Sequence, residues 1–493
     1  MSASPWEEER LPDPVVVIGS GAAGVNFART LLVKGYRVLM LDVGHRGTTP
    51  VLPLDDFTGL RNKLDDPANY LLGPNYEALI LPGFGSEYYG FPPSKMHIFQ
   101  ERKEFRFQAN GISPLVSFAA GGLAEAWTGG SYPFNDQELE AYPFGYAALE
   151  PYYSEVSERI GISGADDDLT RFMPLHSGLM EPLKLDEHSV QLLQSYGRNR
   201  RSLIGKHRFY MGRARLATLT RDLGGRKGCG YLGRCLWGCP TRSLYTPTVT
   251  LEECLQHELF EYVPKMYVTH FRFDSGNRIR SVVAKSTDDG VEREFSVSTL
   301  VLAGGTLSSS TIFLNSIFRD SGEVCTLRGL MDNRQVMMPF LNLKMLGKRF
   351  EASSYQYNQI AIGVEGASAR DYIHGLVTTL KTALIHPLVQ TLPFDLRTSV
   401  AVFRNIHAAL GLVNINFADW RREENQMTLV DQSSPDGPRL ALSYQPSADE
   451  PHRLRKAIAT FRSALWNLGC AAPPSMTRLR PMGASVHYAG SIQ

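Results

Sequence analysis

The sequence has no apolar run long enough to span a bilayer, and its N-terminal residues (MSASPWEEERLPDP) lack the apolar core of a signal peptide. Its formal net charge is only +1 and no block of lysine and arginine appears. No global field therefore favours nucleic acid or an anionic membrane as a partner. These absences predict a cytoplasmic protein that binds neither nucleic acid nor membrane.

Cysteine is also scarce, because six cysteines in 493 residues are too few for a disulfide scaffold. Three of them, Cys229, Cys235 and Cys239, have the spacing C-x5-C-x3-C, without the C-x2-C pairs of zinc ribbons and bacterial ferredoxins. Cys254 could add a fourth ligand but falls in a predicted helix. We predict no metal site and favour buried thiols or one local disulfide, with metal or iron–sulfur binding as the weaker alternative.

Length and composition are those of an ordinary globular chain. Hydrophobic residues make up 43% and charged residues 20% of the sequence. A chain of 493 residues is too long for one simple core, so two domains, which can be interleaved, are expected.

A glycine-rich turn follows the first predicted strand. Residues 15–18 (VVVI) are a β-branched run typical of a strand buried on both faces, and a helix is predicted from about residue 22 to residue 34. The turn between them reads GSGAAG (Gly19–Gly24). Its first glycine allows a tight turn, its second lets backbone approach a pyrophosphate, and its third lets the helix pack against the sheet. The N–H groups of the helix N-terminus would face the phosphates.

An acidic residue ends the second predicted strand, residues 37–42 (RVLMLD). Asp42 stands about twenty residues after the glycine turn, where a carboxylate can accept hydrogen bonds from ribose hydroxyls. Strand, turn, helix, strand and acid together predict a dinucleotide-binding βαβ unit. The motif alone leaves FAD and NAD open.

Three later stretches carry further signals. AAGGLAEAWTGGSYPFND (residues 119–136) is dense in glycine, which lets backbone approach a flat cofactor. STLVLAGGTLSSSTIFLNS (residues 298–316) indicates a buried strand, a small-residue turn and a helix, and GASVHYAGS (residues 483–491) contains one histidine. Taken singly, they could be a surface loop, an ordinary strand–helix junction and a structural histidine.

In this order, these stretches resemble the glucose–methanol–choline (GMC) family of flavoenzymes, and most closely its pyranose-oxidase-like members. The matching elements are the fingerprint at Gly19–Gly24, the segment Trp127-Thr128, the strand and turn Val301–Gly305, and the H-x-x-G-[ST] motif at His487–Ser491. PFGYAALEPYYSEVSERIGISG (residues 143–164) also resembles the family's segment after its flavin-covering loop. Residues 330–470 match only weakly.

The resemblance implies FAD as cofactor and His487 as the catalytic base, because imidazole has a pKa near working pH. The implied cofactor-binding residues are Gly19, Ser20, Gly21, Ala23, Gly24, Asp42, Val43, Gly121, Gly122, Trp127, Thr128, Gly129, Gly130, Val268, Ala303 and Gly304. Val268 could equally be a plain core valine. The resemblance also suggests that residues 331–335 (MDNRQ) form a structural turn.

Two departures from the family pattern modify this expectation. Pyranose oxidases attach FAD covalently to a histidine directly before the tryptophan, and Ala126 takes that place here, so we expect a non-covalent flavin. Family members also continue for several dozen residues beyond the H-x-x-G-[ST] motif, with a second catalytic histidine or asparagine. We expect one of three explanations: the chain is a fragment, the protein has lost the tail with its second catalytic group, or the tail is supplied by another copy in a homo-oligomer or by another partner chain.

The predicted fold is α/β (α+β), a Rossmann-type FAD-binding domain interleaved with a sheet-based substrate domain. We assign residues 1–45, 111–165, 211–330 and 471–493 to the FAD domain, residues 166–210 and 331–470 to the substrate domain, and residues 46–110 to an excursion or lid. The aromatic residues of this excursion could line the substrate site or form a subunit contact. They are Tyr70, Tyr76, Phe84, Tyr88 and Tyr89.

The predicted function is oxidation of a CH–OH group in an alcohol, sugar or glycosylated metabolite, with a histidine base and hydride transfer to flavin N5. The electron acceptor, oxygen or another carrier, stays open. A flavin-binding subunit or degenerate homologue without turnover is the alternative. The glycine-dense stretch at residues 119–136, which resembles the family's flavin-covering loop, disfavours an NAD-dependent dehydrogenase.

Overall fold

The computed structural model describes residues 14–47, 53–76, 78–79, 92–366, 371–382, 385–390, 392–434 and 437–492. The predicted lid aromatics Phe84, Tyr88 and Tyr89 lie outside these residues. Within them, no helix combines the length and the apolar character needed to cross a membrane.

A four-stranded parallel sheet, in the order β5-β2-β1-β9, forms the nucleotide-binding part. Its strands are β1 (Val15–Ile18), β2 (Val38–Leu41), β5 (Phe260–Val263) and β9 (Thr299–Leu302). They are short and rich in β-branched and aliphatic residues, as expected of parallel strands covered on both faces. Helix α1 (Ala22–Val33) connects β1 to β2 and packs on α6 (Pro247–Leu255), while α7 (Thr306–Ser321) follows β9. The predicted βαβ unit is therefore present.

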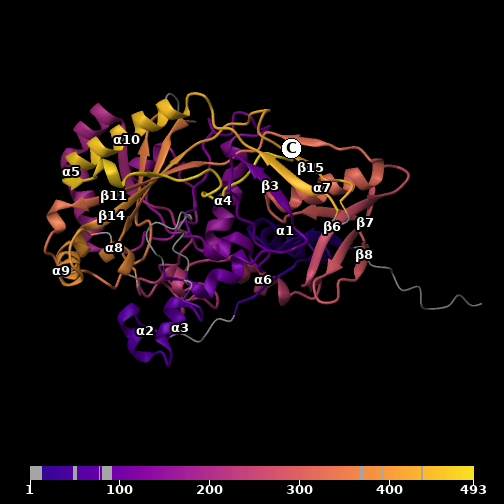
Figure 1. The fold of residues 1–493 in the computed structure, drawn as a ribbon, viewed down its shortest axis with the longest axis horizontal. Coiled ribbons are helices and arrows are strands. Elements are labelled where there is room, and N and C mark those ends of the chain that lie inside the picture. The colour runs from indigo at the N-terminus through magenta and orange to yellow at the C-terminus, as the bar shows by residue number, and fades with distance from the viewer. Residues whose placement is uncertain are drawn as a thin grey trace, which may run out of the picture.

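A three-stranded antiparallel meander lies beside this sheet, on the right of Figure 1. It consists of β6 (Met266–Phe273), β7 (Ile279–Ser286) and β8 (Glu292–Ser296). Its two connections contain Asn277 and Gly290, both at positive φ. Strand β6 packs against α7, which places the backbone around Val268 near the nucleotide-binding part.

A seven-stranded antiparallel sheet forms the second large unit, on the left of Figure 1. Its order is β17-β11-β14-β13-β12-β4, with β18 also paired to β11. The strands are β4 (Phe209–Arg213), β11 (Arg334–Asn342), β12 (Ile360–Val364), β13 (Ile373–Thr379), β14 (Leu410–Phe417), β17 (Cys470–Ala471) and β18 (Arg478–Leu479).

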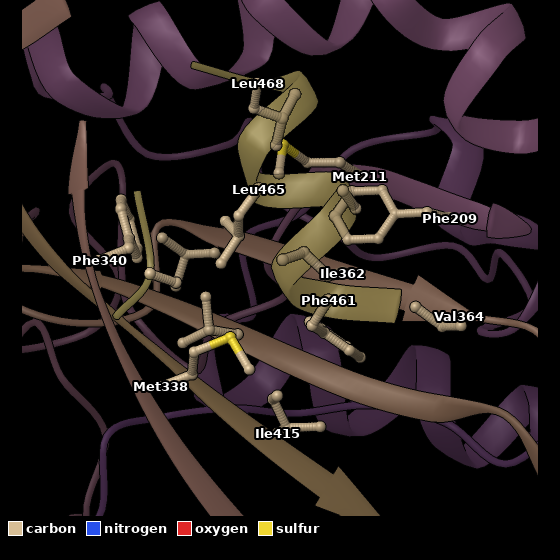
Figure 2. Packing of buried hydrophobic residues seen from close by; sticks show 14 of the residues in the cluster. Phe209, Met211, Met338, Phe340, Ile362, Val364, Ile415, Phe461, Leu465 and Leu468 are labelled. Atoms are coloured by element: carbon tan, nitrogen blue, oxygen red, sulfur yellow. The ribbon is translucent and has the colours of Figure 1, made fainter. Parts of the chain in front are cut away.

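One face of this sheet is covered by α5 (Glu187–His207) and α10 (Glu450–Asn467). Figure 2 shows Phe461 and Leu465 of α10 facing strand residues such as Met338 and Ile415. Every second residue of the strands belongs to this core, as the two-residue side-chain period requires. The intervening residues, among them His374, Asn414 and Asn416, therefore lie on the opposite face.

Two segments differ from the predicted layout. The end of the predicted excursion forms β3 (Phe107–Asn110), and part of the predicted substrate domain forms β15 (Gln426–Val430) and β16 (Arg439–Ser443). Together with β10 (Thr326–Arg328) they make a further sheet, in the order β10-β15-β16-β3. Its alternate apolar residues share a core with Val43 and Leu307, so hydrophobic burial draws these segments to the nucleotide-binding part.

The rest of the predicted excursion contains short helices that its weak periodicity did not reveal. These are α2 (Phe57–Lys63), α3 (Pro67–Leu72) and the 3-10 helix Pro93–Phe99. Asp56 and Asp66 cap α2 and α3 through side-chain hydrogen bonds. Tyr70 packs against Trp237 and Tyr76 is exposed. The remaining α-helices of the described residues are α4 (Tyr146–Ile160), α8 (His386–Gln390) and α9 (Leu396–Ile406).

Candidate functional site

A cavity of about 610 Å³ opens at the carboxyl ends of β1, β2 and β9. This is the edge at which open α/β sheets bind ligands. The predicted residues that line it are Gly19, Ser20, Gly21, Ala23, Asp42, Val43, Gly121, Gly122, Val268, Ala303 and Gly304. The cavity thus brings together segments that are far apart in the sequence, and its volume suits a cofactor.

The three fingerprint glycines play different structural roles. Gly19 has a φ of +96°, and a Cβ on it would lie 2.8 Å from the carbonyl oxygen of Ala303. A Cβ on Gly24 would lie 2.0 Å from the carbonyl oxygen of Gly19, so Gly24 serves helix packing and is not among the lining residues. A Cβ on Gly21 would meet no protein atom within 4 Å. The cavity, and not the protein core, therefore borders Gly21.

Asp42 is a buried carboxyl at the cavity wall. Its Oδ2 accepts hydrogen bonds from the Ser20 hydroxyl and, at 3.1 Å, from the Tyr262 hydroxyl. Burial raises the pKa of Asp42 to about 6, against the opposing effect of these hydrogen bonds. Ser20 also accepts a hydrogen bond of 3.0 Å from the backbone N–H of Gly121, which connects the glycine-dense stretch 119–136 to the glycine turn. Sequence reasoning missed Tyr262, since no motif distinguishes this strand tyrosine.

Two polar groups at the wall lack partners. Ser308 Oγ and Asn315 Oδ1 are buried and make no hydrogen bond to any other part of the described chain, although both residues line the cavity. A buried polar atom without a partner costs roughly 1–3 kcal/mol. The first N–H groups of α1 and α7 also face this region, because Ala22, Ala23, Thr306 and Leu307 are lining residues. This donor and acceptor set suits a ligand with phosphate, ribose and a base, so the residues present fit FAD.

The predicted segment Trp127–Gly130 is placed elsewhere, outside the cavity lining. The indole N–H of Trp127 donates to the carbonyl oxygen of Tyr245 at 2.6 Å, and Thr128 Oγ1 accepts from Asn358 at 2.8 Å. Ala217 donates to the Gly129 carbonyl and Gly130 forms a bridge with Leu216. Hence this segment connects the two large units of the fold.

Tyr488, Gly490 and Ser491 line the cavity. His487 is not a lining residue itself, but it directly precedes Tyr488 in the chain and therefore lies beside the cavity. Thr306 Oγ1 donates to the Tyr488 carbonyl at 2.7 Å, and the Ser310 and Ser491 hydroxyls are 2.8 Å apart. The segment is thereby held at the N-terminal turns of α7. Val486, with a φ of +59°, is a β-branched residue in the left-handed region, a strained conformation typical of functional sites.

The side chain of His487 is exposed to solvent. The protein atoms packed around the ring nevertheless desolvate it and so lower its pKa. The Asp332 carboxylate opposes this shift and the Arg480 guanidinium adds to it. A lowered pKa keeps the ring neutral at pH 7, as a base requires. His487 Nδ1 lies 2.9 Å from Asn333 Oδ1. Asn333 belongs to the stretch 331–335 that the sequence suggested as a structural turn, so its contact with the histidine appears only in the tertiary structure.

The cysteines of the C-x5-C-x3-C stretch are free thiols. Gln356 N donates to Cys235, and the Thr241 and Ser243 hydroxyls contact Cys239 at 3.4 Å and 3.2 Å. The local disulfide that we considered is not formed. Among the described residues, no group of three or more histidine, cysteine and acidic side chains has a metal-binding arrangement.

We expect Cys239 to react with iodoacetamide before Cys229 and Cys235. Burial raises the pKa of the Cys229 thiol to about 11 and that of Cys235 well above its usual value. At Cys239 burial is outweighed by the hydroxyls of Ser243 and Thr241, which lower the pKa. Time-resolved peptide mapping would give the order, and Ser243→Ala should slow Cys239 selectively. Equal rates at all three thiols would contradict the expectation.

Comparison with known proteins finds no matching family model. Two curated relatives match parts of the chain: paromamine 6'-oxidase of Streptomyces fradiae is 28% identical over 173 residues, and the fructose dehydrogenase large subunit of Gluconobacter japonicus is 22% identical over 348 residues. These matches cover 34% and 67% of this chain, but only 27% and 60% of the respective relatives.

Two solved structures share the fold. Pyridoxine 4-oxidase of Mesorbium loti superposes with a TM-score of 0.54 at 14% identity, covering 96% of this chain and 85% of that one. An R554A variant of Aspergillus oryzae RIB40 formate oxidase, whose study concerned FAD modification, gives 0.55 at 10% identity and coverages of 92% and 81%. The fold class is thus confirmed, as is the resemblance to the GMC family.

Proposed function

As a relative of the GMC oxidoreductases, this chain is, we propose, an FAD-dependent oxidoreductase that oxidises the CH–OH group of an alcohol, a sugar or a glycosylated metabolite. The observation that carries this proposal is the cavity beside Gly21, which combines two helix N-termini, the Asp42 carboxyl and the unpartnered Ser308 and Asn315. The curated relatives are named for reactions on paromamine and on fructose, which supports a hydroxyl-rich substrate.

In the proposed cofactor complex, the glycine turn and the N-terminus of α1 would hold the pyrophosphate, and Asp42 would accept a hydrogen bond from a ribose hydroxyl. Gly121 and Gly122 would bring backbone to the cofactor, and Val268 would border its adenine end. FAD supplies the hydride acceptor at its N5. Because Ala126 offers no nucleophile at the predicted attachment point, we propose that the flavin is held without a covalent bond.

The chemistry assigned to this chain's own residues is proton removal. His487, neutral at pH 7, takes the hydroxyl proton of the substrate while the carbon-bound hydrogen leaves as hydride with its electron pair. The products are a carbonyl compound, a protonated imidazole and a reduced cofactor. Oxygen or another carrier would accept the electrons from the reduced cofactor.

We expect the purified protein to be yellow, with a flavin spectrum that bleaches when substrate is added without oxygen. Polyols, hexoses and aminoglycosides would be tested in turn as donors, with NADH as a control for non-specific reduction. Acid precipitation should release the flavin into the supernatant. A folded but colourless protein that fails to take up added FAD would refute the cofactor assignment, and a yellow pellet would refute non-covalent binding.

A further inference from the structure

Three amide side chains link His487 to the seven-stranded sheet. Asn333 lies one residue before β11, which also carries Gln335, and Asn416 lies on β14. Gln335 and Asn416 are direct partners in the β11–β14 register, and His374 of β13 is the partner of Asn416 on the other side. Strand pairing therefore fixes the positions of these amides.

The direction of hydrogen bonding in this network has two independent anchors. At one end, Asn416 Nδ2 faces two backbone carbonyl oxygens, that of Asn414 at 3.1 Å and that of His374 at 3.5 Å. Carbonyls only accept, so this atom must be the amide nitrogen. Asn416 Oδ1 is then the atom that faces Asn333 and Gln335.

At the other end, the Arg480 guanidinium donates to Gln335 Oε1 at 2.5 Å. Since a guanidinium has no acceptor, Gln335 must present its amide nitrogen to Asn416 Oδ1, at 2.8 Å. The two anchors agree that Asn416 Oδ1 is an acceptor. Asn333 therefore donates to it through Nδ2, at 2.9 Å, and turns its own Oδ1 to His487 Nδ1, also at 2.9 Å.

We propose that this amide relay fixes neutral His487 in the tautomer that is protonated at Nδ1, which leaves Nε2 unprotonated and free to take the substrate proton. Asn333 is a positioning residue in this proposal, because it touches the histidine and not the substrate. The inference rests on the proposed function for its catalytic meaning, but the tautomer itself can be measured in protein without cofactor or substrate.

A second set of contacts holds the backbone of the histidine. The His487 N–H donates to Ser485 Oγ at 3.0 Å, and the Ser485 hydroxyl donates to Asp332 Oδ1. Asp332 Oδ2 accepts from Gly483 N at 2.6 Å. The adjacent residues Asp332 and Asn333 thus fix the main chain and the ring separately, so that changing Asn333 leaves the main-chain contacts in place.

The direct test is nuclear magnetic resonance of protein labelled with ¹⁵N at histidine. Long-range proton–nitrogen correlations distinguish a protonated from an unprotonated ring nitrogen, and His487→Gln assigns the signals by their loss. We expect His487 to be protonated at Nδ1 in the unaltered protein and to become a mixture of tautomers in Asn333→Ala. Protonation at Nε2, or a tautomer that Asn333→Ala leaves unchanged, would overturn the proposal.

Kinetics provide the second readout. Asn333→Ala should lower the rate of flavin reduction about 10- to 100-fold, the usual effect of losing the partner that orients a functional histidine, with little change in KM. Asn333→Asp keeps an acceptor at Nδ1, and although it loses the donor to Asn416 Oδ1 it should restore the tautomer. Its added negative charge, beside Asp332 and against Arg480, raises the pKa of His487, so the acid limb of the kcat/KM profile should move to higher pH.

Asn405→Ala, at an exposed position of α9, is the matched control and should change neither readout. Folded Asn333→Asp protein that is as slow as Asn333→Ala at every pH would overturn the positioning role. If the tautomer is as expected but no alcohol reduces the flavin, the relay stands and the proposed function fails. The two failures are therefore distinguishable.

Discussion

Replacing Gly21 by valine should remove the flavin from the protein and leave the fold intact. The backbone at Gly21, with φ −63° and ψ 176°, is one that any residue adopts. A side chain there would meet no protein atom within 4 Å and would project where the pyrophosphate is expected. We expect FAD to bind at least about 100-fold more weakly, a loss of about 2.7 kcal/mol.

The measurement is the ratio of flavin to protein absorbance after purification, together with titration of added FAD and a thermal melt of the flavin-free form. Gly197→Val in α5 is the matched control, because a Cβ there also meets nothing within 4 Å but Gly197 is exposed. Gly24→Val would not serve, since its clash with the Gly19 carbonyl would damage the fold. Full flavin content in Gly21→Val would refute the assignment of the cavity.

Replacing His487 by alanine should slow flavin reduction by about 10²–10⁴-fold, the usual contribution of a general base. The flavin content should be unchanged, because His487 is not among the residues that line the cavity. In the unaltered protein the reduction rate should fall only at pH values below about 6.5, the ordinary pKa of histidine, because desolvation lowers the pKa of this one.

Rapid-mixing measurements of flavin bleaching, across pH and without oxygen, would test this expectation. His452→Ala, at an exposed position of α10, is the control and should leave the rate unchanged. If His487→Ala reduces its flavin at the normal rate, another group removes the proton. The Nδ1 contact with Asn333 would then be a structural feature alone.

Local sequence patterns predicted the nucleotide-binding part well. The strand expected at residues 15–18 is β1, with the same bounds, the helix expected from about residue 22 to residue 34 is α1, Ala22–Val33, and the strand expected at 37–42 is β2, Val38–Leu41. The glycine turn, the strand ending at Asp42 and the strand before Gly304 all reach the cavity. These signals succeed because their physical causes are local: a turn that needs glycine, a 3.6-residue period, or a β-branched run.

The structures of the excursion (residues 46–110) and of the region that matches the family weakly (residues 330–470) were harder to predict from the sequence. Strands β3, β15 and β16 come together only because their apolar faces share a core with Val43 and Leu307, contacts that no short window contains. The segment Trp127–Gly130 had the composition of a cofactor-covering loop. Its hydrogen bonds to Tyr245, Tyr355 and Asn358 are formed with distant residues, so its place between the two units was not predictable from its glycines.

The sequence by itself determined the βαβ unit, the dinucleotide fingerprint and the histidine of the C-terminal motif, since each depends on residues adjacent in the chain. Only the tertiary structure decided which residues surround that histidine. Asn333 and Asn416 lie 154 and 71 positions away from His487, and the pairing of β11 with β14 in the seven-stranded sheet brings the two amides into one chain of hydrogen bonds with the histidine. Hydrogen-bond direction depends on neighbours in space, and neither spacing nor composition in the sequence specifies those neighbours.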